Sequence, residues 1–163
     1  MGKMVHKLVG ADNVKLITKV EYSGNIKKAI HTGNMLLKFA KTHPLLGLAA
    51  NQIGIMERVC LATIDNELRV FINPVITEKS GKILSKDEGC LSFPHIRGNI
   101  WRHKEIIVKH LVFSKYRSKP LEVTKIEVFT GFNAIVLEHE IEHLEGIRCI
   151  DRMKGKYRTD KEN

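Results

Sequence analysis

The segment that decides the fold is GFNAIVLEHEIEHLE, residues Gly131–Glu145. Its apolar side chains and both of its histidines recur at helical spacing and fall on one broad face: Phe132, Ile135, Val136, His139 and His143. Thr130 precedes the segment, and Gly146 follows it at a position where helices commonly end. The sequence therefore predicts a helix late in the chain whose inner face carries two histidines.

An H-E-x-x-H motif lies within this helix. His139 and His143 are four residues apart, so in a helix they stand one above the other and can hold one metal ion. Glu140 can reach a water molecule at that ion and take its proton, because a metal lowers the pKa of such a water. The alternative is an amphipathic helix with two hydrogen-bonded histidines, although ionisable residues on an inner face need a purpose.

A tetrahedral metal with two histidine ligands needs a third ligand from the protein and an open position. Two of the three cysteines compete for this role, and their wide spacing argues against a disulfide framework. Cys149 lies six residues after His143, where the metzincin peptidases place a third histidine, and Gly146 matches the glycine of that pattern. Cys90 lies far upstream in EGCLS, residues 88–92. Spacing alone leaves both cysteines open.

Upstream, residues 25–41 predict a second helix, with Ser23 as its cap and Pro44 beyond its end. Its predicted inner face excludes Phe39 and consists of Ile26, Ile30, Leu37 and Ala40, flanked by Ala29 and Leu36. Between the two helices, short β-branched runs predict strands: RVCLATI, LRVFINPVI, KEIIVKHLVF and LEVTKIEVF. This order predicts an α+β fold in which a mostly antiparallel sheet packs on the last helix.

Length and composition indicate one domain. The chain has 163 residues, which is enough to bury a core, and we expect the domain to cover residues 1–153 with a polar, basic tail over residues 154–163. No apolar run approaches the length of a membrane span, and the first residues lack the apolar core of a secretory signal. We therefore expect a cytoplasmic protein with no membrane partner.

The chain is basic, with a formal net charge of +9. Such a charge favours contact with nucleic acid or with a ribosome. The basic residues are spread along the chain, however, with one local cluster over Lys154–Arg158, and no nucleic-acid motif is present. The sequence therefore predicts no specific binding of DNA and gives little support for specific RNA recognition.

Three segments together resemble the ordered motifs of the peptide deformylase family. They are GLAANQ at residues 47–52, EGCLS at residues 88–92 and the HEIEH helix at residues 139–143. The longer segments EGCLSFPHIRGNIWR and HLEGIRCIDRM also resemble the family, so the resemblance covers most of residues 40–153. It implies antiparallel sheets packed around a central metal-binding helix, with a helix near the N-terminus.

By this resemblance the protein is a metal-dependent hydrolase that removes the N-terminal formyl group from formyl-methionine of nascent polypeptides and releases formate. The metal ligands are Cys90, His139 and His143, which leaves Cys149 as a packing residue. Glu140 is the general acid and base. The Leu91 backbone N–H and the Gln52 side-chain amide hold the developing oxyanion, together with the metal.

The resemblance also implies the substrate site. Leu46 and Gly47 line a groove in which the peptide pairs like a strand, beside Glu88 and Gly89. Phe132, Ile135 and Val136 are candidates for the wall of a methionine pocket, and Leu84 and Arg97 are further candidates.

Ferrous iron is the physiological metal that the family implies, with nickel or cobalt as active substitutes and zinc usually poorer. The implied partners are N-formylmethionyl nascent peptides and, transiently, the ribosome. We expect a monomer in the cytoplasm of a bacterium or of an infected bacterial host.

Several positions depart from the family pattern. Leu45 stands where the first motif normally begins with glycine, which restricts the backbone at the mouth of the groove. In the last motif Glu138 replaces glutamine and Glu142 replaces aspartate, although Glu142 can still orient a ligand or a nearby arginine. No apolar helical stripe follows the metal helix, as in short deformylases encoded by phages.

Two other interpretations remain open at this point. A zincin-like peptidase would use Cys149 or a downstream acid as its third ligand. A non-catalytic protein of the same fold would bind formyl-peptides or RNA without turnover. The intact set of Glu140, Gln52 and the ligands argues against the second of these.

Overall fold

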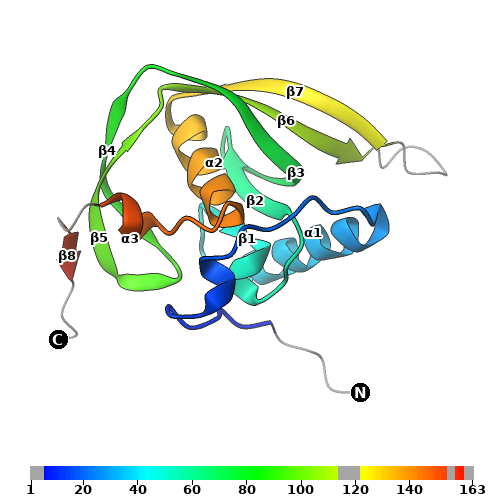
Figure 1. The fold of residues 1–163 in the computed structure, drawn as a ribbon, viewed down its shortest axis with the longest axis horizontal. Coiled ribbons are helices and arrows are strands. Elements are labelled where there is room, and N and C mark those ends of the chain that lie inside the picture. The colour runs from blue at the N-terminus through cyan, green and yellow to red at the C-terminus, as the bar shows by residue number, and fades with distance from the viewer. Residues whose placement is uncertain (1–5, 114–121, 154–156, 160–163) are drawn as a thin grey trace.

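Two antiparallel sheets surround a central helix in the computed structural model, which describes residues 6–113, 122–153 and 157–159 (Figure 1). The first sheet has the strand order β1-β2-β3-β6-β7. Its strands are β1 (Gly47–Ala49), β2 (Val59–Ile64), β3 (Glu67–Ser80), β6 (Glu105–Phe113) and β7 (Glu122–Thr130). The second sheet has the order β4-β5-β8 and consists of β4 (Ile83–Cys90), β5 (Phe93–Arg102) and β8 (Tyr157–Thr159). The predicted α+β class with mostly antiparallel sheets is confirmed.

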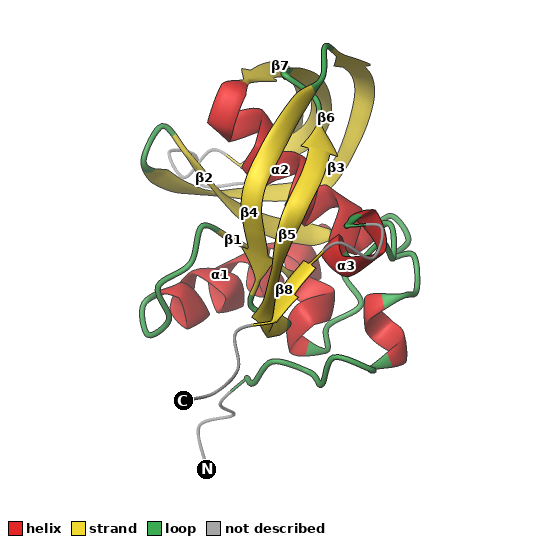
Figure 2. Ribbon diagram, turned by 90° about the vertical axis from the view of Figure 1, so that its left-hand side faces the viewer, coloured by secondary structure: helices red, strands yellow, loops and turns green. Residues whose placement is uncertain are grey.

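Three α-helices lie in the described residues: α1 (Ile26–Ala40), α2 (Gly131–Leu144) and α3 (Cys149–Arg152). Short 3-10 turns lie at η1 (Val14–Leu16) and η2 (Ala50–Ile53). In Figure 2 the second sheet stands in front of α2, while α1 lies below the first sheet, so α2 is enclosed between the two sheets. The predicted central position of the histidine-bearing helix is confirmed.

Helix α2 is buried along most of its length rather than on one stripe. Every residue from Val136 to Leu144 is buried, whereas Phe132 in the first turn is 58% exposed. Leu137 and Ile141 belong to the main core cluster together with residues of β2 and β6. A helix enclosed on all sides must satisfy its polar side chains internally, so its histidines and glutamates require partners.

The four apolar runs that the sequence marks as strands correspond to β2, β3, β6 and β7. Strands β4 and β5 were not among them, although they pair over most of their length. Strand β5 alternates between buried and exposed positions and carries charged residues and a glycine, so it lacks a β-branched run. A sheet with one exposed face needs apolar side chains on the other face only.

Two predicted details of the first helix are wrong. The N-cap is Asn25, whose side chain accepts a hydrogen bond from the Lys28 N–H, and not Ser23. Ser23 instead donates to Glu57 and accepts from the Arg58 N–H.

The buried face of α1 is centred differently from the predicted one, whose residues are only partly buried although they pack against the core: Ile26, Ile30, Leu37 and Ala40. Phe39 is buried with four other residues of the helix, namely Ala29, Thr32, Gly33 and Leu36. A Cβ atom at Gly33 would lie 2.7 Å from the Cγ1 atom of Val70. The helix therefore approaches β3 most closely along its small residues, which a search for large apolar side chains overlooks.

The predicted tail over residues 154–163 is described only at Tyr157–Thr159, and its other residues lie outside the described part. Those three residues form β8, whose backbone pairs with β5 from Ile96 to Gly98. This part of the tail therefore forms a strand, which its polar composition had not indicated. None of the described helices has the length and hydropathy that crossing a membrane requires.

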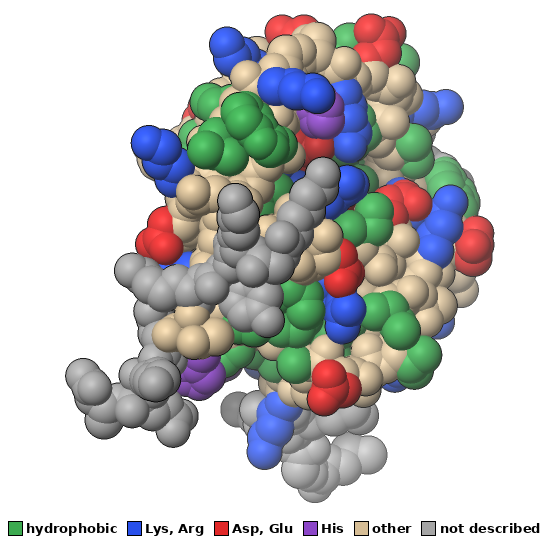
Figure 3. Space-filling model, turned by 60° about the vertical axis from the view of Figure 1, so that its left-hand side comes forward, with side chains coloured by type: hydrophobic (Ala, Val, Ile, Leu, Met, Phe, Trp, Pro, Cys, Tyr) green, Lys and Arg blue, Asp and Glu red, His purple; other side chains and the backbone are tan. Residues whose placement is uncertain are grey.

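The positive charge of the chain does not gather on the face drawn in Figure 3. Lysine and arginine side chains there are interspersed with aspartate and glutamate side chains. Where side chains are drawn in colour, this face therefore carries no continuous basic patch of the kind that specific nucleic-acid binding uses.

Candidate metal centre and active site

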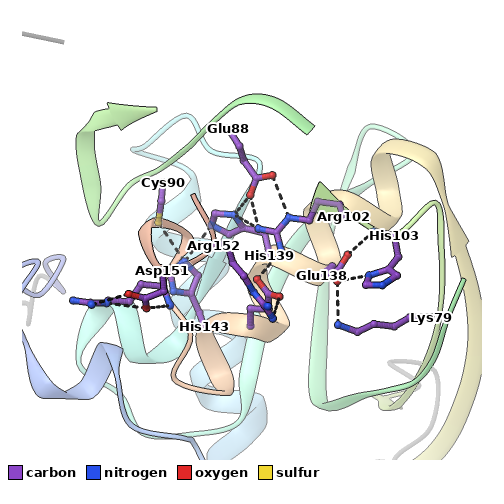
Figure 4. A network of polar contacts seen from close by, with 12 residues as sticks. Lys79, Glu88, Cys90, Arg102, His103, Glu138, His139, His143, Asp151 and Arg152 are labelled. Atoms are coloured by element: carbon purple, nitrogen blue, oxygen red, sulfur yellow. Dashed lines mark hydrogen bonds and ion pairs between the residues drawn. The ribbon is translucent and has the colours of Figure 1, made fainter. Parts of the chain in front are cut away.

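Three metal-ligating side chains from two elements converge beside α2. Cys90 ends β4, and His139 and His143 lie one turn apart on α2. The Cys90 Sγ atom lies 3.2 Å from the His143 Nε2 atom, which lies 3.2 Å from the His139 Nε2 atom (Figure 4). All three ligand atoms lie within 4.8 Å of one another. The structure thus brings together the predicted ligand set.

The end of β4 is irregular where it delivers the cysteine. The register between β4 and β5 shifts between Gly89 and Cys90, and Cys90 pairs with Phe93. Such an irregularity redirects the side chain that follows it. Cys149, the competing cysteine, is buried with Leu16, Phe93, Ile100 and Met153 in a separate apolar cluster against which Cys90 packs. Cys149 is thus a packing residue beside the ligand.

Glu88 fixes the orientation of one ligand. Its Oε1 atom lies 2.6 Å from the His139 Nδ1 atom, so Nδ1 donates a hydrogen bond to it and Nε2 is the ring nitrogen that faces the other two ligands. Burial opposes ionisation of Glu88, but hydrogen bonds from His139 and Arg102 lower the pKa of its carboxyl to about 2. Glu88 therefore holds the ring of His139 as a carboxylate.

Arg102 is the buried cation of this region, with 1% of its side chain exposed. It donates two hydrogen bonds to Glu88, at 2.5 Å from Nη2 and 3.2 Å from Nε. Its Nη1 atom donates to the Glu142 Oε2 atom at 2.6 Å. All three nitrogen atoms of the guanidinium group are therefore engaged, and sequence reasoning had not identified Arg102 as part of the site.

The two glutamates that depart from the family pattern are both buried and paired. Glu142 accepts from Arg102, which agrees with the expectation that it orients a nearby arginine. Glu138 lies 3.0 Å from Lys79 Nζ and accepts from the His103 backbone N–H at 3.0 Å. Burial opposes its ionisation, but these contacts lower the pKa of Glu138. The added charge at position 138 is therefore compensated locally.

The cysteine ligand is favoured as a thiolate. A hydrogen bond from Cys149 and the nearby His143 and His139 lower the pKa of the Cys90 thiol well below its ordinary value, although burial opposes this. Burial likewise lowers the pKa of His139, but hydrogen bonds to Cys90 and Glu88 outweigh it and raise that pKa. A thiolate and two imidazoles are a donor set that binds several divalent transition metals.

Glu140 lies beside the ligands and is only 5% exposed. Burial raises the pKa of Glu140 to about 7, although His139 and His143 oppose this. Among the described residues its Oε2 atom has no hydrogen-bond partner. Its position depends on Gly47, where a Cβ atom would lie 2.6 Å from the Glu140 Cδ atom. A buried carboxyl group of this kind can accept and return a proton.

The amide of Gln52 is oriented by the short 3-10 turn that carries it. Its Oε1 atom accepts from the Ala49 backbone N–H at 2.8 Å. Its Nε2 atom donates to Ser92 Oγ at 3.0 Å and lies 3.4 Å from Cys90 Sγ. The NH₂ group of the Gln52 side chain therefore points toward the metal-ligating side chains.

A neighbouring amide secures the same turn to the metal helix. Asn51 Nδ2 donates to the His143 carbonyl oxygen at 2.6 Å. Asn51 lies in the GLAANQ segment, but its role was not anticipated.

A cleft of about 700 Å³ opens over these residues. All the predicted substrate-contacting residues line it: Leu46, Gly47, Glu88, Gly89, Arg97, Phe132, Ile135 and Val136. So do the predicted catalytic residues Gln52, Leu91 and Glu140. Leu45 also lines it, whereas the less favoured candidate Leu84 does not and pairs with Trp101 instead. Lining residues that were not anticipated include Pro44, Ser85, Lys86, Asp87, Pro94 and Ile96.

The residues present fit a metal ion. The three donor atoms belong to a thiol and two imidazoles, one ring is held by a carboxylate, and the cleft reaches both His139 and Cys90. Together with Glu140, this geometry defines a metal-dependent hydrolase of the H-E-x-x-H type.

Comparison with known proteins identifies the family. The model of the family described as polypeptide deformylase matches residues 5–159. A peptide deformylase of Pelotomaculum thermopropionicum is 44% identical over 110 residues, which make up 68% of this chain and 66% of that protein. One of Thermodesulfovibrio yellowstonii is 36% identical over 144 residues, or 85% of this chain and 81% of that protein.

Solved structures agree with this result. The crystal structure of peptide deformylase from Thermotoga maritima superposes with a TM-score of 0.77 at 29% identity, covering 93% of this chain and 99% of that chain. A peptide deformylase of Plasmodium falciparum also gives a TM-score of 0.77, at 25% identity and over 90% of this chain and 86% of that one. The chain belongs to the peptide deformylase family, metal-dependent hydrolases that remove the N-terminal formyl group from nascent peptides.

Proposed function

We propose that this chain hydrolyses the formyl group of N-formylmethionyl peptides in the described cleft, with Glu140 transferring the proton. The observation that carries the proposal is the buried Glu140 carboxylate, which lines the cleft next to the converged ligands. Formamide hydrolysis needs a base for the attacking water and an acid for the leaving amine. Glu140 takes the proton from water and returns it to the amine, so one carboxylate serves both steps.

Cys90, His139 and His143 hold the metal in this proposal, and ferrous iron is the ion that we assign to the cell. Nickel, cobalt or zinc would occupy the same donor set. When bound, the ion supplies a Lewis acid that makes water more acidic and polarises the formyl carbonyl group. Glu88 keeps the His139 ring in the orientation that this requires.

Two donors serve the formyl oxygen as negative charge develops on it. One is the Leu91 backbone N–H, and the other is the side-chain amide of Gln52. The hydrogen bond from Ala49 supports this role of Gln52, because it turns the NH₂ group toward the ligands. Donors that are fixed before reaction stabilise a developing oxyanion without reorganisation.

The peptide binds in an extended form between two strands. Strands β1 and β4 are each at the edge of a sheet, and residues of both line the cleft. An unpaired strand edge can accept an extended peptide by backbone hydrogen bonds. Leu46 and Gly47 on one side, and Glu88, Gly89 and Arg97 on the other, form this groove. Phe132, Ile135 and Val136 form the wall of the apolar pocket for the methionine side chain.

We also propose where in the cell the reaction takes place and in which form the protein acts. The substrates are nascent chains, so we assign the protein to the cytoplasm of a bacterium or of an infected bacterial host, transiently close to the ribosome. We assign it as a monomer with one catalytic domain over residues 1–153, to whose second sheet the strand β8 of the basic tail is added. The net charge of +9 favours approach to ribosomal RNA.

Release of formate tests the proposal. Protein purified anaerobically with iron, or loaded with nickel, is incubated with formyl-Met-Ala-Ser, beside the unformylated peptide as a control. We expect formate release that depends on the metal, and no cleavage of the control. A protein replete with metal that releases no formate would contradict the proposal and favour a formyl-peptide binding protein. Cleavage of the control peptide bond would favour a peptidase.

A further inference from the structure

A series of charged contacts leads from the surface to the histidine ligand His139. It begins at Arg152, the last residue of α3, whose side chain is 44% exposed (Figure 4). Arg152 Nη2 donates to the Glu142 Oε1 atom at 2.7 Å. The other oxygen of Glu142 accepts from Arg102 at 2.6 Å, and Arg102 is bonded to Glu88, which holds His139. Each member of the series contacts the next directly.

Arg152 brings the guanidinium groups of this series to two, which equals the number of its carboxylates. Glu88 and Glu142 are two carboxylates that share the single buried guanidinium group of Arg102. Because buried charges need compensation, a second cation stabilises this pair of carboxylates, and Arg152 supplies it from the surface. Without Arg152, Glu142 would depend on Arg102 alone and would draw that guanidinium group away from Glu88.

We propose that Arg152 is a positioning residue for the metal centre: by pairing with Glu142 it keeps Arg102 on Glu88, and so keeps the His139 ring aimed at the metal. Outer partners of metal ligands commonly change metal affinity when they are lost. Arg152 touches no ligand atom, and its effect is transmitted through three side chains. The inference rests on the metal site alone and does not depend on which peptide is hydrolysed.

The same short helix offers a matched control. Arg148, the residue that caps α3, pairs with Asp151 at 2.8 Å in a contact confined to α3. Arg148→Gln and Arg152→Gln therefore remove the same charge from neighbouring positions. Only Arg152→Gln interrupts the series that leads to His139.

The test measures binding of Co²⁺ to the metal-free protein. Competition with a chelating indicator gives the affinity, and the visible absorption of bound Co²⁺ reports the geometry of its ligands. We expect Arg152→Gln to weaken Co²⁺ binding about tenfold and to alter the spectrum. We expect Arg148→Gln to change neither, and Arg152→Lys, which keeps a cation opposite Glu142, to recover most of the affinity. Thermal unfolding of the metal-free variants checks that both glutamine variants are folded.

A second pair of variants isolates the pathway through Glu142. In a Glu142→Gln background the carboxylate that Arg152 neutralises is gone, so Arg152→Gln should then have no further effect on affinity. Affinity of Arg152→Gln within about twofold of the unaltered protein would overturn the proposal, as would an equal loss in Arg148→Gln. The proposal would also be overturned if Arg152→Lys bound Co²⁺ as weakly as Arg152→Gln. An effect of Arg152→Gln on Co²⁺ affinity that is undiminished in the Glu142→Gln background would overturn it too. Because no peptide is present, these outcomes are independent of whether formate is released.

Discussion

At the residue scale, the position of Glu140 depends on the absence of a side chain at Gly47. A Cβ atom there would lie 2.6 Å from Glu140 Cδ, which is closer than two carbon atoms approach without a bond. Leu45, which stands where glycine is usual in the family, lines the same cleft. The Glu140 side chain therefore keeps its position at the cleft only while residue 47 has no Cβ atom.

We expect Gly47→Ala to lower kcat by about tenfold or more, because a small displacement of a catalytic group is costly. The metal content should be unchanged, since no ligand is moved. The measurement is formate release together with metal analysis of the same preparation. Gly24→Ala is the control, because a Cβ atom at Gly24 would meet no atom within 4 Å. Equal kcat values in the two variants would refute the role of Gly47.

At the scale of an element, the N-terminal end of α1 is tied to the chain before β2 by a buried carboxylate. Ser23 Oγ donates to Glu57 Oε2 at 2.6 Å, and Lys28 Nζ lies 2.5 Å from Glu57 Oε1. Burial opposes ionisation of Glu57, but these two contacts lower its pKa below the ordinary value of 4.5. The folded state therefore prefers the carboxylate form.

This preference makes a contribution to stability that depends on pH. Since the pKa of Glu57 is lower in the folded state, its contribution is present above about pH 4.5 and is lost as the pH falls through the folded pKa. We expect Glu57→Gln to reduce stability at neutral pH and to flatten the acid decline. Urea unfolding midpoints at about pH 7 and pH 3.5 measure both effects. Glu67 on β3 is exposed, so Glu67→Gln is the control. If stability falls as steeply with decreasing pH in Glu57→Gln as in Glu67→Gln, the assignment of Glu57 is wrong.

Prediction from the sequence succeeded for elements in which large apolar residues recur at a regular spacing. It failed where the buried residues are not large and apolar. The runs that became β2 and β6 are rich in β-branched residues, so their strands were predictable. The centre of the inner face of α1 was misplaced because residues such as Gly33 carry no apolar signal, although the predicted residues do pack against the core. Likewise, β5 was missed because only one of its faces is buried.

The residues of the candidate site, too, were predictable from the sequence only in part. His139, His143 and Glu140 follow from helical spacing, but the third ligand could not be chosen by spacing, since Cys90 is remote in sequence and only tertiary structure brings it to α2. The resemblance to the family supplied that choice. Arg102 could not have been predicted from a pattern, because a buried arginine has the same sequence signal as an exposed one.

At the scale of the whole molecule, the site forms where the two sheets meet around α2. The three-stranded sheet contributes Cys90 at the end of β4, and α2, which packs on the five-stranded sheet, contributes the histidines. The cleft that reaches them is bordered by an edge strand of each sheet. The fold thus places the buried carboxyl group of Glu140, the three metal-ligating side chains and the cleft at one junction.

The most direct test compares Glu140→Gln with the unaltered protein for both metal content and formate release from formyl-Met-Ala-Ser. The substituted amide keeps the size of the side chain but cannot accept the proton from water. We expect the variant to retain its metal and its fold and to lose about a thousandfold in kcat. Normal turnover by a metal-replete Glu140→Gln protein would contradict the proposed mechanism, because the proton would then be carried by another group.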